Sequence, residues 1–197
     1  KIMKKITFLT ILLLSILVNA QSPIISLQDF DNNSNQPTGT YIKDLNNYYT
    51  PYLGEWKWES GNNSLEIKFE KISMVHDGEL YFDEIIGKFK YVKDGVILHN
   101  SLDFSITNSN YWSYLYYIFK GSGYLENFKI FTRFYDIHKK QHLNAFFELI
   151  NPLTLNNVLV TNEIKMTTSI ITQLDLNDTH DSEVGLNYPT EIILTKQ

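Results

Sequence analysis

The stretch "GEWKWESGNNSLEIKFEKI", residues 54–72, decides the fold because its side chains describe a β-hairpin. Trp56 and Trp58 alternate with charged residues, which is the two-residue period of a strand with one buried and one solvated face. Residues 60–63 are small or polar and tolerate the positive φ angles of a tight turn. Apolar and charged residues alternate again over residues 65–70, so the chain is expected to return antiparallel.

The same pattern recurs to the end of the chain. Turn signals at residues 76–78 and 93–95, a break at 121–123 and a polar connection at 138–141 separate further strand-like runs. These runs cover residues 79–92, 96–104, 111–120, 124–137, 142–150, 156–170 and 190–196. We therefore predict an all-β protein, an antiparallel up-and-down meander or barrel of about 8–10 strands.

The N-terminal part of the chain divides into three predicted regions. Residues 1–20, with early lysines and an apolar run too short to span a membrane, are typical of a signal peptide and predict export to the periplasm or beyond the cell. Residues 21–40 are predicted to be a flexible segment, and residues 41–197 a single β-barrel-like domain. Asp44 is a candidate N-cap for a short helix that ends at Thr50.

Composition excludes some classes of partner. The formal net charge is -5, and removing residues 1–20 removes three lysines and no acidic residue, which lowers it to about -8. Nucleic acids and anionic membranes both require a dense positive surface, so neither is expected as a partner. The chain contains no cysteine, so its fold is not stapled by disulfides. After residue 20 no run is apolar for long enough to predict a membrane span.

Gly54-x-Trp56 on the first strand of such a meander resembles the start of a lipocalin or related calycin. The resemblance implies a closed barrel with Trp56 at its narrow end, beneath a basic side chain of the last strand. Lys196 is the candidate for that side chain, with Arg133 as the less favoured alternative. This resemblance concerns the shape of the protein alone and implies no function.

Longer phrases are similar to a family of uncharacterised secreted proteins of Bacteroidota. They are "YIKDLNNYYTPYLGEWKWESGNNSLEIKFEKI", "YFDEIIGKFKYVKDGV" and the ending "YPTEIILTK". The family is recognised as a domain of unknown function, so the resemblance implies a small exported β domain and no particular activity.

No catalytic or metal-binding constellation is predicted, and no cofactor is expected. His138 and His142 have a helical ligand spacing but lie between strand-like runs, and residues 175–183 depart from the EF-hand pattern. Asp83 and Glu84 are neighbours on a strand and should face opposite sides, whereas paired acid–base catalysis requires convergence. The sequence thus leaves enzymatic activity open and favours its absence.

Aromatic residues are the main indication of function. In "YWSYLYYIF", residues 111–119, both alternating faces of the predicted strand are apolar, so one face is available for binding. Candidate ligand-binding residues are Trp58, Tyr111, Trp112, Tyr114 and Tyr117. We expect a binding module for a small hydrophobic or aromatic ligand or a glycan. The alternative is a filled barrel that contacts another secreted protein and holds no small ligand.

Overall fold

The computed structural model describes residues 22–31, 35–125, 129–156, 158–171 and 186–197, and side chains are described within these ranges except at residues 122–125 and 158. The signal peptide predicted at residues 1–20 and the residues compared with the EF-hand pattern, 175–183, lie outside them. The strands are β1 Ile24–Ser26, β2 Tyr41–Lys43, β3 Gly54–Ser60, β4 Asn63–Asp77, β5 Leu80–Lys93, β6 Val96–Asn100, β7 Phe119–Leu125, β8 Lys129–Asp136, β9 Gln141–Leu149, β10 Leu153–Leu155, β11 Val158–Val160, β12 Glu163–Ile170 and β13 Glu191–Lys196. Three 3-10 turns accompany them: η1 Leu27–Asp29, η2 Thr50–Tyr52 and η3 Tyr111–Tyr114. None of the helical turns in these ranges has the length and apolarity needed to span a bilayer.

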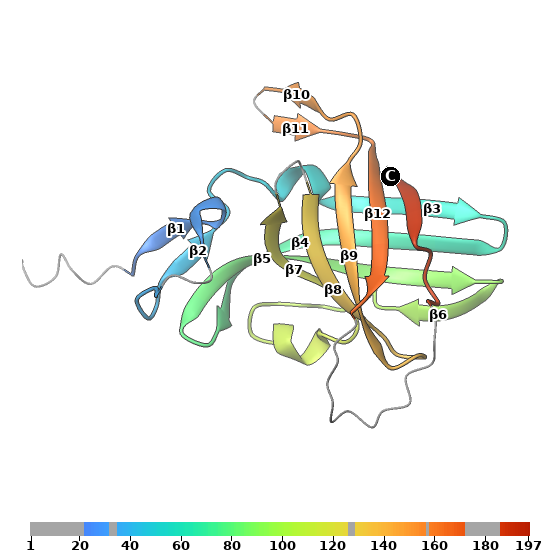
Figure 1. Cartoon of the computed structure of the whole chain (residues 1–197), viewed down its shortest axis with the longest axis horizontal. Helices are drawn as coiled ribbons and strands as arrows, with labels where there is room; N and C mark the ends of the chain where they lie inside the picture. The colour runs from blue at the N-terminus through green and yellow to red at the C-terminus, as the bar shows by residue number, and fades with distance from the viewer. Residues whose placement is uncertain (1–21, 32–34, 126–128, 157, 172–185) are drawn as a thin grey trace, which may run out of the picture.

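Eight of these strands form a closed antiparallel barrel (Figure 1). Their order around the barrel is β3-β4-β5-β7-β8-β9-β12-β13, and β13 pairs again with β3. This is the chain order with β6 and the β10–β11 hairpin left out, so the predicted all-β up-and-down barrel is confirmed. Closure pairs both edges of the sheet, and exposed edges are otherwise prone to aggregation.

One edge of strand β5 pairs with β4, and its other edge is shared by three strands. β2 pairs in parallel at Tyr81 and Phe82, β7 pairs at 85–87, and β6 pairs at 90–93. Only the middle of β5, where β7 pairs with it, therefore belongs to the closed barrel on this edge. β6 and β7 are joined by residues 101–118, which have to cross the outside of the barrel wall.

Bulky side chains fill the barrel interior. Phe119 packs against three other rings, with centroid distances of 4.5 Å to Phe89, 4.6 Å to Phe134 and 5.5 Å to Phe147. Phe69 closes the group at 4.9 Å from Phe147. All five side chains are at most 2% exposed. An eight-stranded barrel is just wide enough to be filled by side chains in this way. The interior agrees with the alternative expectation of a filled barrel.

One end of the barrel is closed by residues 44–53 and Trp56. The Trp56 indole donates a hydrogen bond to the Tyr52 carbonyl (2.6 Å), and the Lys196 ammonium lies 5.1 Å from the centre of its ring. Gly54 precedes it with φ +109°, a conformation that favours glycine. The side chain of Lys196 runs 3.5 Å from where a Cβ of Gly54 would lie.

The prediction of a short helix from Asp44 to Thr50 is wrong. Asp44 does accept hydrogen bonds from the amides of Tyr48 and Tyr49 (2.7 and 3.3 Å), as an N-cap would. However, Asn47 has φ +57°, which interrupts a right-handed helix, and the chain forms turns followed by η2.

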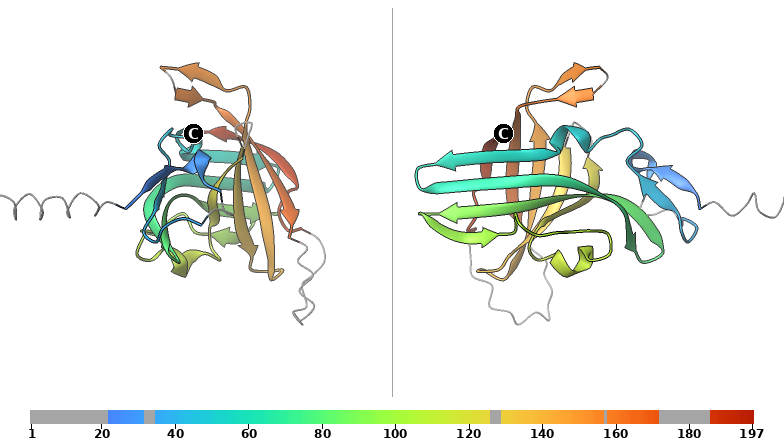
Figure 2. Two further views of the ribbon diagram at one scale, coloured as in Figure 1. Left: turned by 60° about the vertical axis from the view of Figure 1, so that its left-hand side comes forward. Right: turned by 180° about the vertical axis from the view of Figure 1, so that it is seen from behind.

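The segment at residues 21–40 was expected to lie outside the core, and part of it packs on the barrel instead. Ile24–Ser26 pair in parallel with β2, and Leu27 is 7% exposed within the main core cluster. These strands extend the sheet to one side of the barrel (Figures 1 and 2). Hydrophobic burial of Leu27 anchors a segment whose composition is otherwise polar.

The β10–β11 hairpin projects from the barrel beyond the ends of β9 and β12 (Figures 1 and 2). Leu153 and Leu155 lie on one face and are 66% and 58% exposed. Its exposed surface is aliphatic, in contrast to the aromatic surface described next.

Candidate functional site

The aromatic run at residues 111–119 does not form the predicted strand. Tyr111–Tyr114 form η3, and β7 begins only at Phe119. Tyr111 and Ile118 both have their side chains buried against β4 and β5, where they join Ile72, Val75 and Ile86 in a second hydrophobic cluster. The run therefore lies along the outer wall of the barrel, and the alternating faces assigned to it from the sequence are not formed.

Large aromatic side chains on this segment remain at the surface. Trp112, Tyr116 and Tyr117 are 43%, 55% and 41% exposed, and Tyr114 is half-buried. We use "aromatic band" for these side chains together with the neighbouring Phe104, Tyr135 and His142. Exposed aromatic side chains that gather on one segment are typical of a binding surface rather than of scattered surface residues.

Polar contacts hold the Trp112 ring and the backbone at Tyr117 in place. The Trp112 indole donates a hydrogen bond to the His76 carbonyl (2.9 Å), and the Lys120 ammonium lies 4.5 Å from the ring centre. The Tyr117 backbone carbonyl is 2.9 Å from Nε2 of His99 on β6. A ring fixed as that of Trp112 is loses little conformational freedom when a ligand binds.

Ring contacts connect the rest of the band. Phe104 lies 5.1 Å from Tyr114 and 5.8 Å from Tyr117 between centroids. Tyr116 lies 5.1 Å from Tyr135 on β8, in an edge-to-face arrangement, and 6.2 Å from His142 on β9. The band thus extends from the segment onto the outer face of two strands. Most of its members pair an apolar ring with a polar hydroxyl or nitrogen.

A buried carboxylic acid lies beneath the segment. Glu84 on β5 is 2% exposed, and its Oε2 has no hydrogen-bond partner among the described residues. The hydroxyls of Tyr111 and Tyr49 are likewise buried and unpartnered in that part of the chain. Burial raises the pKa of Glu84 to about 8, although the charge of Lys120 acts in the opposite direction. Burial, with the negative charge of Glu84, also raises the pKa of Tyr111.

The neighbouring Asp83 has a different environment. Its carboxylate accepts hydrogen bonds from the Tyr41 hydroxyl and from the Asp44 amide (3.1 Å), and Lys71 lies 3.7 Å away. The two adjacent carboxylates thus have different partners and do not converge on one bond. Asp83 holds the turn that closes the barrel end, which is a structural role.

The other predicted site residues lie apart from the band. Trp58 on β3 is half-buried and packs against the barrel core, on the same strand face as Trp56. Arg133 on β8 is exposed, with its guanidinium 5.4 Å from the centre of the Phe131 ring, so Lys196 and not Arg133 lies over Trp56. Of the five candidate ligand-binding residues, the structure brings together Tyr111, Trp112, Tyr114 and Tyr117, and buries Tyr111.

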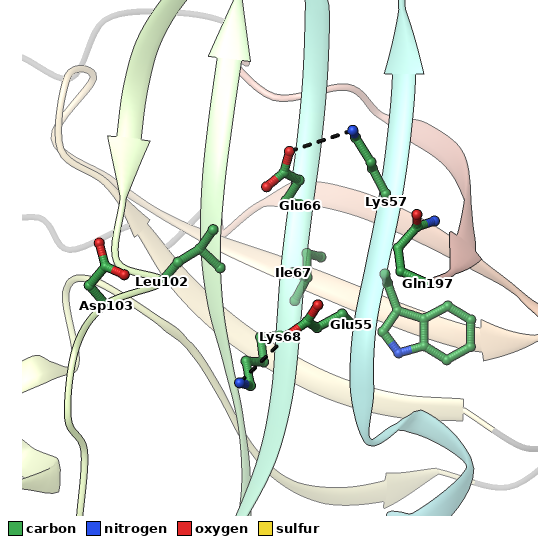
Figure 3. A pocket seen from close by; sticks show the side chains of 9 residues that line it. Glu55, Lys57, Glu66, Ile67, Lys68, Leu102, Asp103 and Gln197 are labelled. Atoms are coloured by element: carbon green, nitrogen blue, oxygen red, sulfur yellow. Dashed lines mark ion pairs between the residues drawn. The ribbon is translucent and has the colours of Figure 1, made fainter.

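A concave surface, separate from the aromatic band, lies on the outside of β3 and β4 (Figure 3). It is a groove of about 430 Å³ whose labelled side chains include charges of both signs. Lys57 is 3.7 Å from Glu66, and Lys68 is 3.6 Å from Glu55. Each lysine faces a glutamate across the strand pair, so these four charges compensate one another, and Asp103 leaves one further negative charge in the lining.

His138 and His142 have separate surroundings. His138 lies in the β8–β9 turn with Nε2 2.9 Å from the Leu98 carbonyl, whereas the His142 ring lies 4.9 Å from that of Tyr135 at an interplanar angle of 60°. Within the described ranges, no group of three or more His, Asp or Glu side chains is arranged to hold a metal ion.

Sequence reasoning missed several members of the site. Tyr116 was not among the candidate ligand-binding residues, and the contribution of Tyr135 and His142 depends on pairing between distant parts of the chain. Burial of Glu84 has no signal in the sequence, because it results from residues 101–118 crossing the wall.

Comparison with known proteins gives a family and no activity. No curated protein matches the chain, and no solved structure matches it. The model of one family, described as a family of unknown function (DUF6705), matches residues 3–197. With almost the whole chain matched, this protein belongs to the DUF6705 family, whose function is unknown.

Proposed function

We propose that the protein is a non-catalytic binding module that recognises an extended glycan on the aromatic band of its outer wall. The observation that carries the proposal is the set of ordered but exposed rings at Trp112, Tyr116 and Tyr117. Sugar rings stack their apolar faces on aromatic side chains, and tyrosine hydroxyls supply hydrogen bonds at the edges. The spread of rings along one segment and two strands suits a chain of sugars better than a single one.

The filled barrel argues against a ligand in the interior. Space there is occupied by phenylalanine rings in mutual contact, from Phe69 through Phe147 and Phe119 to Phe89. A hydrophobic ligand would require several of these side chains to move, at a cost comparable to unpacking a core. We therefore replace the expected small hydrophobic ligand by a glycan bound on the outer surface.

Charge and surface chemistry narrow the ligand class. The negative charge of the chain disfavours strongly acidic polysaccharides, so neutral or amine-bearing glycans are the better candidates. The described side chains of the band include no aliphatic residue. The exposed leucines of the β10–β11 hairpin form a separate surface.

Export, as predicted from residues 1–20, belongs to the same proposal, because cell-surface and environmental glycans are met outside the cytoplasm. N-terminal sequencing of protein secreted by a bacterial host tests this part. A mature chain beginning at Gln21 is expected. A chain that keeps residues 1–20 would contradict export by cleavage.

Binding to a panel of soluble neutral polysaccharides, measured by affinity electrophoresis and calorimetry, tests the function. Trp112→Ala and Tyr116→Ala should each weaken binding about tenfold, corresponding to about 1.4 kcal/mol. Tyr48→Ala is the matched control, since Tyr48 is a half-buried tyrosine on the turn before β3 and away from the band. Equal binding by all three variants, or no binding by a folded wild type, would contradict the proposal and direct attention to a protein partner.

A further inference from the structure

Residues 101–118 are attached to the barrel by a small set of contacts. Their apolar contacts are made to the second cluster, to which Tyr111 and Ile118 contribute buried side chains and Ile106 and Leu115 half-buried ones. Polar contacts include the Lys88 ammonium to the Phe104 carbonyl at 3.3 Å. A segment without strand pairing, held by side-chain contacts outside the main core, can detach while the barrel stays folded.

The buried acid lies under this attachment. Oε2 of Glu84 and the hydroxyls of Tyr111 and Tyr49 are enclosed without hydrogen-bond partners of normal geometry among the described residues. The Lys120 charge and the neighbouring Tyr111 hydroxyl compensate an ionised carboxylate only in part, because burial is the largest influence on Glu84. The closed segment therefore favours a neutral Glu84, whereas a detached segment exposes Glu84 to water in either protonation state.

Charged and titratable groups face Glu84 from the surrounding elements. Lys120 on β7 favours the ionised form, and Asp77 at the end of β4 favours the protonated form. Tyr111 on η3 and Tyr49 in the turn before β3 are neutral, because burial raises the pKa of both hydroxyls. Near Glu84, therefore, the Lys120 cation favours the ionised form, whereas burial and the Asp77 carboxylate favour the protonated form.

We propose that residues 101–118 form a proton-controlled flap, which stays closed over a protonated Glu84 and opens when that proton is lost. The flap carries Phe104, Trp112, Tyr114, Tyr116 and Tyr117, so opening disperses the aromatic band. This inference rests on the proposed function and adds its regulation: the surface is assembled at neutral and acidic pH and lost at alkaline pH.

The direction of the pH dependence follows from linkage. Burial raises the pKa of Glu84 from its ordinary 4.5 to about 8 in the closed state. The closed state thus binds more protons than the open state between these values, and rising pH favours opening throughout this interval. Between pH 6 and pH 9 the opening equilibrium should rise about a hundredfold.

A single cysteine measures opening directly, because the chain has no other. Ile118, at the end of the flap, is fully buried against β4 and β5, so Ile118→Cys should react with a thiol reagent only when the segment opens. Its labelling rate, divided by that of an exposed thiol at the same pH, should rise about a hundredfold between pH 6 and pH 9. Adding Glu84→Gln should abolish the rise. Adding Glu163→Gln, which neutralises an exposed acid on β12, should leave it unchanged.

Lys120→Gln provides a second test that does not alter the acid. Removing a charge that lowers the pKa of Glu84 in the closed state should move the pH at which the rise in labelling levels off, near 8 in the wild type, to higher values. A pH-independent corrected rate, or a rise that persists in Glu84→Gln, would overturn the flap. If Glu84→Gln does not fold, the direction of the Lys120→Gln shift decides. Labelling uses no glycan, so a failure of glycan binding leaves this test valid, and a flap that stays closed at pH 9 overturns only the regulation.

Discussion

Gly87→Ala probes whether the barrel interior is solid, which decides between internal and surface binding. Gly87 lies in the middle of β5, opposite Phe69 on β4 and Phe119 on β7. A Cβ added there would lie 2.8 Å from Cε1 of Phe69, 3.1 Å from Cγ2 of Ile67 and 3.2 Å from Cβ of Phe119. All three distances are shorter than ordinary carbon–carbon contacts, so the neighbours have to move.

The expected cost combines two opposing effects. Overpacking a tight core by one methyl group destabilises by about 1–3 kcal/mol. Replacing glycine by alanine within a strand contributes a gain of about 0.5–1 kcal/mol, because the unfolded chain loses conformational freedom. The net loss should therefore be about 1–2 kcal/mol, or roughly 2–8 °C in melting temperature for a domain of this size.

Urea unfolding followed by tryptophan fluorescence measures this loss. Phe69→Leu is the matched partner, since leucine lacks the ring atom that the new methyl group would meet first. In the Phe69→Leu background, Gly87→Ala should cost at least about 0.5 kcal/mol less than in the wild type, which a double-mutant cycle detects. An unchanged or increased stability of Gly87→Ala alone would refute a filled interior and restore the internal-ligand hypothesis.

Further predictions address the rest of the fold and are measured by the same unfolding titrations. Trp56→Ala should cost about 3–5 kcal/mol, because it removes the buried indole at the barrel end, whereas the exposed Glu55→Ala should cost close to nothing. Leu27→Ala should cost about 2 kcal/mol, and a cost near zero would mean that the N-terminal segment is not anchored. Lys196→Met should cost at most about 1 kcal/mol, the usual value of a cation–π contact. Because the pKa of Glu84 is raised to about 8 in the fold, wild-type stability relative to Glu84→Gln should fall from about pH 5 to about pH 8 and then level off; a difference that grows with pH in the opposite sense would contradict this burial.

Local patterns were sufficient for the hairpins that begin the barrel. Gly61, Gly78 and Gly95 all have positive φ angles in the turns expected at those places, and residues 65–70 of β4 alternate between buried and half-buried as predicted. Such features depend on neighbours close in sequence, so a single chain is enough to read them. The count of strands predicted a meander or a barrel, and the pairing of β13 with β3 decided for the closed barrel.

The aromatic run at residues 111–119 could not be assigned in this way. Both of its faces are apolar, so alternation carried no information about which residues are buried, and aromatic residues favour strands in general. The central edge of β5 is taken by residues 119–121, and residues 101–118 must reach it from the end of β6. Tertiary pairing, rather than local preference, therefore made this segment an outer covering.

By itself, the sequence determined the all-β class and the up-and-down order of strands, because these depend on alternation and on turn residues, whereas the place of Trp56 at a barrel end was implied by the resemblance to lipocalins. Only the tertiary structure decided that the interior is filled, that Tyr135 and His142 join Tyr116, and that Glu84 is enclosed. Each of these depends on which distant segments share an edge or a face of the sheet. Burial and solvation are set by those long-range contacts, and they place the candidate site on the outer wall instead of inside the barrel.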